Sequence, residues 1–451
     1  MSKAFRSWDV EQPLLLARSV QELVPAGHLA HFVRDTVRES LDLSAILAVY
    51  REERGCLPYH PVMMTALLLY AYCQGIYSSR RIARAGEERV DFMAVTARQT
   101  PDFRTISEFR KRYLAALGGL FGQVLRLCAE AGLVRLGHVA LDGTKIHANA
   151  SKHKAMSYGR MKRREAELAG EVVKWFAEAE ATDAAEDEQF GANRRGDELP
   201  EWVANKQRRR AKIREAMAAL EAEARAAATS PEEPLASAGT SESRWEASVD
   251  EPPDPPPPGP SDQAQRNFTD PDSRIMKDAH GFEQAYNAQA MVDADSQVIV
   301  GEGLTNAGTA KQQAEPMVAA TEAQTGRAPS ELSVDSGYCS EANLAHLAEH
   351  GIRGSVATAR QKHGPPSATG QGQPRGGPHT QAMARRLKRG GHRRRHRLRK
   401  QTVEPVFGQI KSARGFRQFL FRGLAKVRDE WRLICTAHNL RKLAGAASAV
   451  G

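Results

Sequence analysis

The chain has 451 residues, a net charge of +10 and a pI of about 9.4, so two or three domains are expected and the charge favours a polyanionic partner. Its five cysteines are scattered without a C-x-x-C pair, which argues against a disulfide framework and a structural zinc site. The longest apolar run is too short to cross a bilayer, and the first residues lack the apolar core of a signal peptide. We therefore expect a cytoplasmic protein that makes no membrane contact.

Residues 1–135 are predicted to form an all-helical N-terminal domain, because their apolar positions follow a helical period. Three short helices are expected over 78–84, 91–95 and 102–112. The first of them carries Arg80, Arg81 and Arg84. Short helices with clustered arginines are typical of a helix-turn-helix-like DNA-binding domain. The alternative is an ordinary helical bundle with a solvated basic face.

Residues 136–451 alternate between strand-like and helical patterns, which predicts an α/β domain with a mixed sheet flanked by helices. The expected elements are a strand (138–141), a hairpin (286–292 and 297–300), a helix (309–324), a strand (331–334), a helix (340–350), a strand (352–357) and a final acid-bearing helix. Two segments are expected to interrupt this domain, namely a charged helical and Pro-rich insertion (155–265) and a Gly/Pro-rich and then Arg-rich loop (358–398).

The positive charge is concentrated just before the last predicted helix. Between His350 and Val403 the sequence has no Asp or Glu, whereas Lys and Arg occur fourteen times. The rest of the chain is slightly acidic. A local basic segment of this kind is typical of an arm that contacts the phosphate backbone of nucleic acid.

Three acids lie in settings that suit metal-dependent chemistry. Asp142 and Asp335 each end an apolar strand-like run and are followed by Gly or Ser-Gly, and Glu404 precedes Pro405 and is predicted to open a helix. Carboxylates are the ligands that Mg²⁺ prefers, and two such ions can support phosphodiester chemistry. Lys411 follows Glu404 by two turns and is expected to contact a phosphate.

Each acid taken alone is weak support for this interpretation. An Asp-Gly pair after a strand is usually a turn, and a Glu that opens a helix usually only complements the helix dipole. The combination of all three acids with an α/β pattern and a basic segment is much more specific.

Five segments carry a resemblance to a known family. The chain resembles bacterial insertion-sequence transposases of the DDE class, which have a ribonuclease-H-like catalytic domain. The similar segments are DGTKIHANASKHKAMS (142–157), NFTDPDSRIM (267–276), GFEQAYNAQ (281–289), DSGY (335–338) and VEPVFGQIK (403–411).

The resemblance implies an activity and a set of site residues. Asp142, Asp335 and Glu404 fall on the catalytic triad that binds Mg²⁺, or Mn²⁺ as the alternative ion. Such an enzyme binds the terminal inverted repeats of its own mobile element, cleaves a DNA strand and transfers it to target DNA, as a homodimer or larger assembly on double-stranded DNA. The expected DNA-binding residues are Lys145, Lys411, Arg80, Arg81, Arg84, Arg397, Arg399 and Lys400.

One segment departs from the family pattern. Related sequences often carry a Tyr and a few basic residues before the third acid, whereas residues 389–400 are Arg-rich and contain no Tyr. A locally shifted reading frame would produce such a composition. Two alternatives therefore stay open, a catalytically inactive DNA-binding relic and a hydrolytic nuclease that lacks strand transfer.

Overall fold

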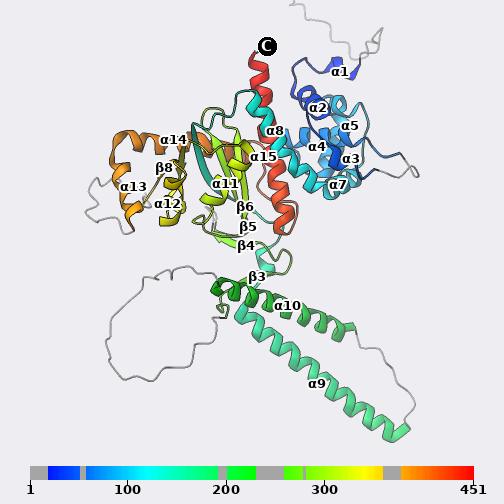
Figure 1. The fold of residues 1–451 in the computed structure, drawn as a ribbon. Coiled ribbons are helices and arrows are strands. Elements are labelled where there is room, and N and C mark those ends of the chain that lie inside the picture. Colours follow the sequence, from blue (N-terminus) through cyan, green and yellow to red (C-terminus); the bar gives the residue numbers. More distant parts are fainter. Residues whose placement is uncertain are drawn as a thin grey trace, which may run out of the picture. The chain divides into compact units, whose positions relative to one another are not determined.

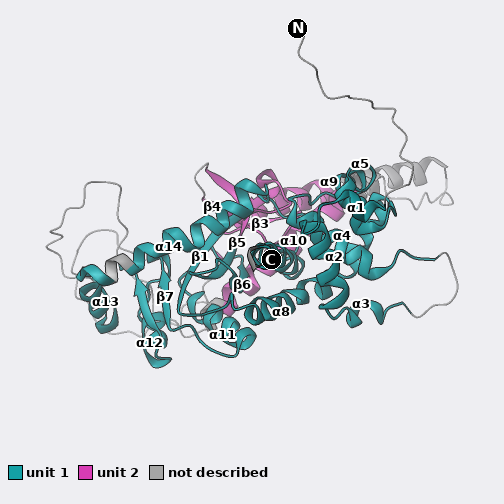
Figure 2. Ribbon diagram, turned by 90° about the horizontal axis from the view of Figure 1, so that it is seen from above, with its two compact units in different colours: residues 1–146, 287–451 teal, residues 147–286 magenta. Residues whose placement is uncertain are grey.

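A computed structural model describes residues 19–50, 57–190, 201–229, 259–277, 281–358 and 377–450. The chain divides into two compact units, which Figure 2 distinguishes by colour. Unit 1 comprises residues 1–146 and 287–451, and unit 2 comprises residues 147–286. No helix in the described ranges combines the length and the apolar character that a membrane span requires.

The N-terminal part of unit 1 is helical, as predicted (Figure 1). Its central helix, α4, is buried along almost its whole length, and α2, α6 and α15 pack against it. Pro61 occupies the first turn of α4, where its missing N–H is not needed, and the imidazole of His60 accepts the Val62 N–H. The helices are α1 (Val20–Leu23), α2 (Leu29–Glu39), α3 (Ser44–Leu47), α4 (Pro61–Cys73), α5 (Ser79–Glu88), α6 (Val90–Thr96), α7 (Phe103–Arg112) and α8 (Leu114–Glu130).

The prediction of a mixed α/β sheet is confirmed. The strands are β1 (His138–His147), β5 (Phe282–Asp293), β6 (Ile299–Thr305), β7 (Glu331–Val334) and β8 (Arg353–Val356). In the sheet β1 lies between β5 and β7, and β8 follows β7. The β1–β7 and β7–β8 pairs are parallel, and β5 and β6 form an antiparallel hairpin.

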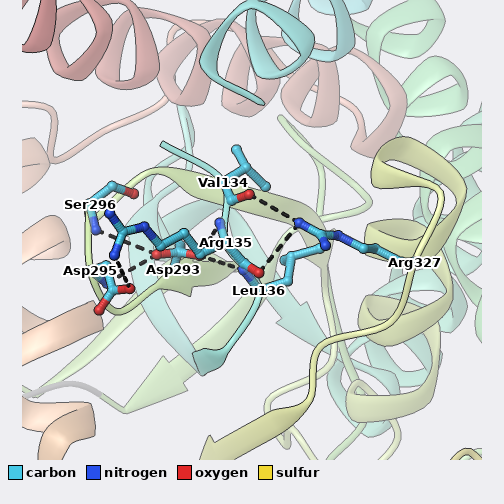
Figure 3. A network of polar contacts seen from close by, with 7 residues as sticks. All are labelled: Val134, Arg135, Leu136, Asp293, Asp295, Ser296 and Arg327. Atoms are coloured by element: carbon cyan, nitrogen blue, oxygen red, sulfur yellow. Dashed lines mark hydrogen bonds and ion pairs between the residues drawn. The ribbon is translucent and has the colours of Figure 1, made fainter. Parts of the chain in front are cut away.

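The hairpin turn is built around Asp293, as Figure 3 shows. This buried carboxylate accepts the N–H groups of Asp295 and Ser296 in the turn and those of Arg135 and Leu136 in the segment before β1. Such a carboxylate satisfies four backbone donors at once and fixes the entry of the chain into β1.

The remaining helices of unit 1 pack around the sheet. They are α11 (Ala314–Thr325), α12 (Glu341–Glu349), α13 (Pro378–Lys388), α14 (Gly390–Gly408) and α15 (Leu424–Val450), with short turns η2 (Ser336–Tyr338) and η3 (Gln409–Ala413). Helices α11 and α15 pack on β6, and α14 packs on β7 and β8 (Figure 1). The fully buried Trp431 of α15 donates its indole N–H to the Gln289 carbonyl of β5 at 3.0 Å.

The prediction of a loop over 358–398 is wrong from residue 378 onward, where α13 and α14 are helical. Pro378 lies in the first turn of α13, where proline is tolerated. The basic segment is also rich in Arg, Leu and Ala, which favour a helix interior. Residues 359–376 lie outside the described residues.

Unit 2 contains a hairpin of two helices and several short strands. The helices predicted in the charged insertion are confirmed. Helices α9 (Tyr158–Phe190) and α10 (Glu201–Thr229) pack through a cluster that includes Met161, Leu168 and Ile213. Its other elements are η1 (Lys152–Lys154), β2 (Ala155–Ser157), β3 (Gln265–Asn267) and β4 (Arg274–Lys277). Strand β4 pairs with residues 282–285 at the start of β5. The Pro-rich stretch up to residue 258 lies outside the described residues.

Candidate active site

Asp142 lies within β1 and not at its end, so the prediction of a strand-end position with a turn at Gly143 is wrong. The strand continues to His147. A Cβ at Gly143 would lie 2.7 Å from Asn287 Oδ1 and nearer still to Gln289 Nε2, so a side chain there has to displace these two amide groups. The Asp142 carboxylate accepts the Gly143 N–H at 2.8 Å.

Asp335 follows β7 directly and lies at the level of Asp142. The parallel register pairs Leu141 with Val334, so the two acids are the next residues along adjacent strands. Asp335 caps η2 and accepts the Ser336 N–H at 2.7 Å. The sequence thus places two carboxylates side by side, because two neighbouring parallel strands each carry an acid at the same level.

Glu404 lies in the last turns of α14, so the prediction that it opens a helix is wrong. The helix begins at Gly390 and continues through Pro405. Pro405 cannot donate to the Gln401 carbonyl, but that carbonyl accepts the side-chain amide of Gln297 at 3.2 Å, which compensates for the missing bond.

The orientation of Glu404 depends on the apolar face of α14. Val403, Val406 and Ile410 are fully buried, and Glu404 is half-exposed. These buried side chains form one apolar face of the helix, and Glu404 lies beside it. A π-helical turn, η3, follows α14 and carries Lys411.

Arg399 joins two of the three acids. One terminal nitrogen of its guanidinium lies 2.5 Å from the Asp142 carboxylate, and the other lies 3.3 Å from Glu404. The Arg399 side chain is only 10% exposed, and its Nε–H has no hydrogen-bond partner among the described residues. Arg399 is predicted from the sequence to bind DNA. Its contact with Asp142 joins residues 257 positions apart, so no local sequence pattern indicates it.

Electrostatics at Asp142 reflect burial among like charges. Burial raises the pKa of the Asp142 carboxyl, the Arg399 guanidinium and the Gly143 N–H lower it, and the charges of Asp335 and Glu404 raise it, so that the pKa lies at about 6. Burial also raises the pKa of the neighbouring Tyr338 phenol, and the charges of Asp142 and Asp335 add to that effect. Closely spaced acids of this kind favour a bound cation.

Tyr338 and Gln289 complete the polar surroundings of the acids. The Tyr338 hydroxyl donates to Gln289 Oε1, and the buried Gln289 Nε2 has no partner among the described residues. Gln289 was not predicted as a site residue. Gln289 is the last residue of segment 281–289, which resembles the family, and this position is the sequence feature that could have identified it.

Lys411 lies close to the strand that carries Asp142. Its ammonium group lies 3.1 Å from Thr144 Oγ1 and 3.0 Å from the Lys145 carbonyl. Lys145 itself is half-buried on the same strand, and Arg397 and Lys400 are exposed on α14.

The other predicted DNA-binding residues lie on α5. Arg80, Arg81 and Arg84 are all exposed, the Arg80 guanidinium lies 5.1 Å from the centre of the Phe103 ring, and Arg84 pairs with Glu88. The structure does not bring these three residues to the carboxylates, because α5 packs against α6 and α7.

The three acids offer the donor chemistry of a divalent-metal site, since hard carboxylate oxygens suit Mg²⁺ and Mn²⁺. In the described parts of the chain no three His, Cys, Asp or Glu residues are already arranged as metal ligands. The Arg399 guanidinium contacts both Asp142 and Glu404 and is the counter-charge of these two acids. By the chemistry of their oxygen donors the three acids fit a divalent metal ion.

Comparison with known protein families gives two matches. A family described as "Transposase domain (DUF772)" matches residues 18–112, which contain α1 to α7, and a family described as "Transposase DDE domain" matches residues 369–444, which contain Arg399, Glu404 and Lys411. No curated protein and no solved structure matches the chain. The two domain matches, found in this order in one chain, support an insertion-sequence transposase of the DDE class.

Proposed function

We propose that the protein binds the terminal inverted repeats of its own mobile element and catalyses metal-dependent DNA strand cleavage and strand transfer. The observation that carries this proposal is the register of Asp142 and Asp335 on adjacent parallel strands, with Glu404 linked to Asp142 through Arg399. The transposase domain matches support the substrate class.

We also propose that the sheet domain is ribonuclease-H-like. A mixed sheet in which the hairpin β5–β6 lies on one side of β1 and the parallel strands β7 and β8 lie on the other supports this assignment. The placement of an acid on β1 and an acid after β7 agrees with the resemblance in the sequence.

In this proposal Asp142, Asp335 and Glu404 hold the divalent ions. Bound metal ions of this kind activate an attacking oxygen and stabilise the leaving oxygen in phosphodiester chemistry. Lys411, held against β1 by Thr144, supplies a positive charge for a phosphate beside the acids. The Tyr338–Gln289 hydrogen bond fixes η2 to β5 and so positions Asp335.

DNA is proposed to contact two basic surfaces. The first comprises Arg80, Arg81 and Arg84 on α5, and the second comprises Arg397 and Lys400 on α14 with Lys145 on β1. Exposed arginines and lysines release counterions from DNA when they meet its phosphates, which makes binding strong and salt-dependent. Strand transfer from two element ends requires a homodimer or a larger assembly on DNA.

The competing candidate is a DNA-binding relic without catalysis. The ion pairs of Arg399 with Asp142 and Glu404 favour it, because a permanently fixed guanidinium would keep metal ions out. The test is Mg²⁺-dependent cleavage of a duplex that contains an element end. Cleavage and joined products support the transposase, cut ends alone indicate a nuclease, and salt-sensitive binding without cleavage in Mg²⁺ or Mn²⁺ indicates the relic.

A further inference from the structure

We propose that Arg399 is an exchangeable internal cation, which neutralises the candidate metal site while DNA is absent and is transferred to a DNA phosphate when metal binds. This inference rests on the proposed metal-binding function of Asp142 and Glu404. It goes beyond that function because it makes metal loading and DNA binding depend on each other through one side chain.

The first argument is that the guanidinium and a metal ion compete for the same oxygens. The two terminal nitrogens of Arg399 lie 2.5 Å from Asp142 and 3.3 Å from Glu404. A bound Mg²⁺ requires such oxygens at about 2.0–2.1 Å. A guanidinium in contact with the same carboxylates would also repel the incoming divalent ion at short range. A metal ion that binds these two oxygens therefore requires Arg399 to leave them.

The second argument is that Arg399 is poorly satisfied where it lies. The side chain is largely buried, yet its Nε–H has no hydrogen-bond partner in the described part of the chain. A buried unpaired donor weakens the internal position of the guanidinium relative to a position where all its donors are used. A DNA phosphate offers such a position, because it accepts two parallel hydrogen bonds from an arginine.

The third argument is that a phosphate would be close by. α14 is fixed on the sheet, since its His396 ring lies 3.2 Å from the Val334 carbonyl. On the same helix Arg397 and Lys400 are exposed and flank Arg399 in sequence. A strand bound by these two side chains brings phosphates to the helix that carries Arg399, whose long side chain can then turn outward while the helix stays in place.

The test measures Mn²⁺ affinity of the full chain without DNA, by electron paramagnetic resonance or calorimetry. Arg399→Gln is expected to bind Mn²⁺ on the order of tenfold more tightly than the parent, because no internal cation has to be displaced. Arg399→Lys, which keeps the charge, should stay near the parent. The matched control is Lys388→Gln, an exposed position on the adjacent helix α13, whose Mn²⁺ affinity should not change.

A second measurement compares the parent with folded Arg399→Gln. The salt dependence of binding to a random-sequence DNA duplex is measured for both proteins in EDTA and in Mn²⁺. Mn²⁺ competes for DNA phosphates in the same way for both proteins, so the comparison between them isolates Arg399. In Mn²⁺ the slope of log affinity against log salt should be steeper for the parent by about one, because Arg399 adds one phosphate contact, and in EDTA the two slopes should agree.

The outcomes separate the inference from the proposed function. If the parent binds Mn²⁺ and folded Arg399→Gln binds it equally or more weakly, Arg399 is only a structural counter-ion and the inference is wrong. Equal salt slopes of the parent and folded Arg399→Gln in Mn²⁺ overturn the transfer to phosphate. If neither parent nor variant binds Mn²⁺, with or without DNA, the metal site itself is wrong and the inference fails with it.

Discussion

The guanidinium of Arg399 lies 2.5 Å from the carboxylate of Asp142, and both side chains are largely buried. This ion pair connects the Arg-rich helix α14 to the central strand β1, two elements whose sequences are far apart. It gives the basic segment before Glu404 a structural role in addition to any contact with DNA.

The pair predicts strong energetic coupling between these two residues. Asp142→Asn leaves a buried guanidinium without its main counter-charge, and Arg399→Gln leaves a buried carboxylate without its own. Breaking a buried pair from one side typically costs about 3–5 kcal/mol. We expect urea unfolding of both single variants and the double variant to give a coupling free energy of about 1–3 kcal/mol. Additive effects would show that the ion pair contributes nothing to stability.

A side chain at position 143 is predicted to lower the stability of the fold. A methyl group there would collide with the amides of Asn287 and Gln289, and relieving such overpacking typically costs about 1–3 kcal/mol. Gly143→Ala should therefore lower the free energy of unfolding by that amount. Gly337→Ala is the matched control, because no atom lies within 4 Å of its added Cβ. Equal stability of the two variants would contradict the packing described around β1.

Glu430 is predicted to make the stability of the fold depend on pH. Its fully buried carboxylate accepts the N–H groups of Leu420 and Phe421, and burial raises its pKa to about 7. Because the folded-state pKa lies above the unfolded value, the folded protein holds this proton more tightly. The Glu430 contribution to stability is therefore lost as pH rises from about 4.5 to about 7, by on the order of 1.4 kcal/mol per unit.

The measurement compares Glu430→Gln with the parent by urea unfolding between about pH 5 and pH 8. Gln cannot ionise, so its stability relative to the parent should increase with pH through this window. Glu130→Gln, at an exposed site on α8, is the control, and its difference from the parent in the free energy of unfolding should stay constant across this pH range. A pH-independent difference for Glu430→Gln would mean that this carboxyl is ionised in the fold throughout the range.

The exposed arginines of α5 are predicted to contact DNA phosphates. Arg81→Gln should weaken duplex binding and reduce the slope of log affinity against log salt by about one, since one ionic contact is lost. Arg38→Gln, an exposed position on α2, serves as the control and should leave both quantities unchanged. If the two variants behave alike in filter-binding or anisotropy titrations, the DNA surface does not include this face of α5.

Much of the fold could be read from local sequence patterns. β7 has the predicted bounds, and α12 and β8 lie within one residue of theirs, because Pro329 and Ser330 precede β7 and Gly351 separates α12 from β8. The hairpin turn at 293–296 also agrees, since Asp293 binds the turn N–H groups locally. These features depend on residues that are neighbours in the sequence.

The errors at the site have long-range causes. Gly143 indicated a turn, but it lies within the strand, where an added Cβ would meet the amide groups of Asn287 and Gln289 on β5. Pro405 indicated a helix start, but Gln297 of the distant hairpin satisfies the carbonyl that the proline leaves free, so the helix runs through it. The position of Arg399 between two acids likewise depends on how α14 packs on the sheet. None of these contacts leaves a local signal.

The central claim is that Asp142, Asp335 and Glu404 form one metal-dependent catalytic site. Asp335→Asn tests it most directly, because an amide oxygen can still cap η2 while the metal-binding charge is lost. In Mg²⁺, cleavage of a duplex carrying an element end should fall by at least about 100-fold, roughly 2.7 kcal/mol of transition-state stabilisation, while duplex binding is retained. Cleavage by Asp335→Asn at the rate of the parent would contradict the assignment.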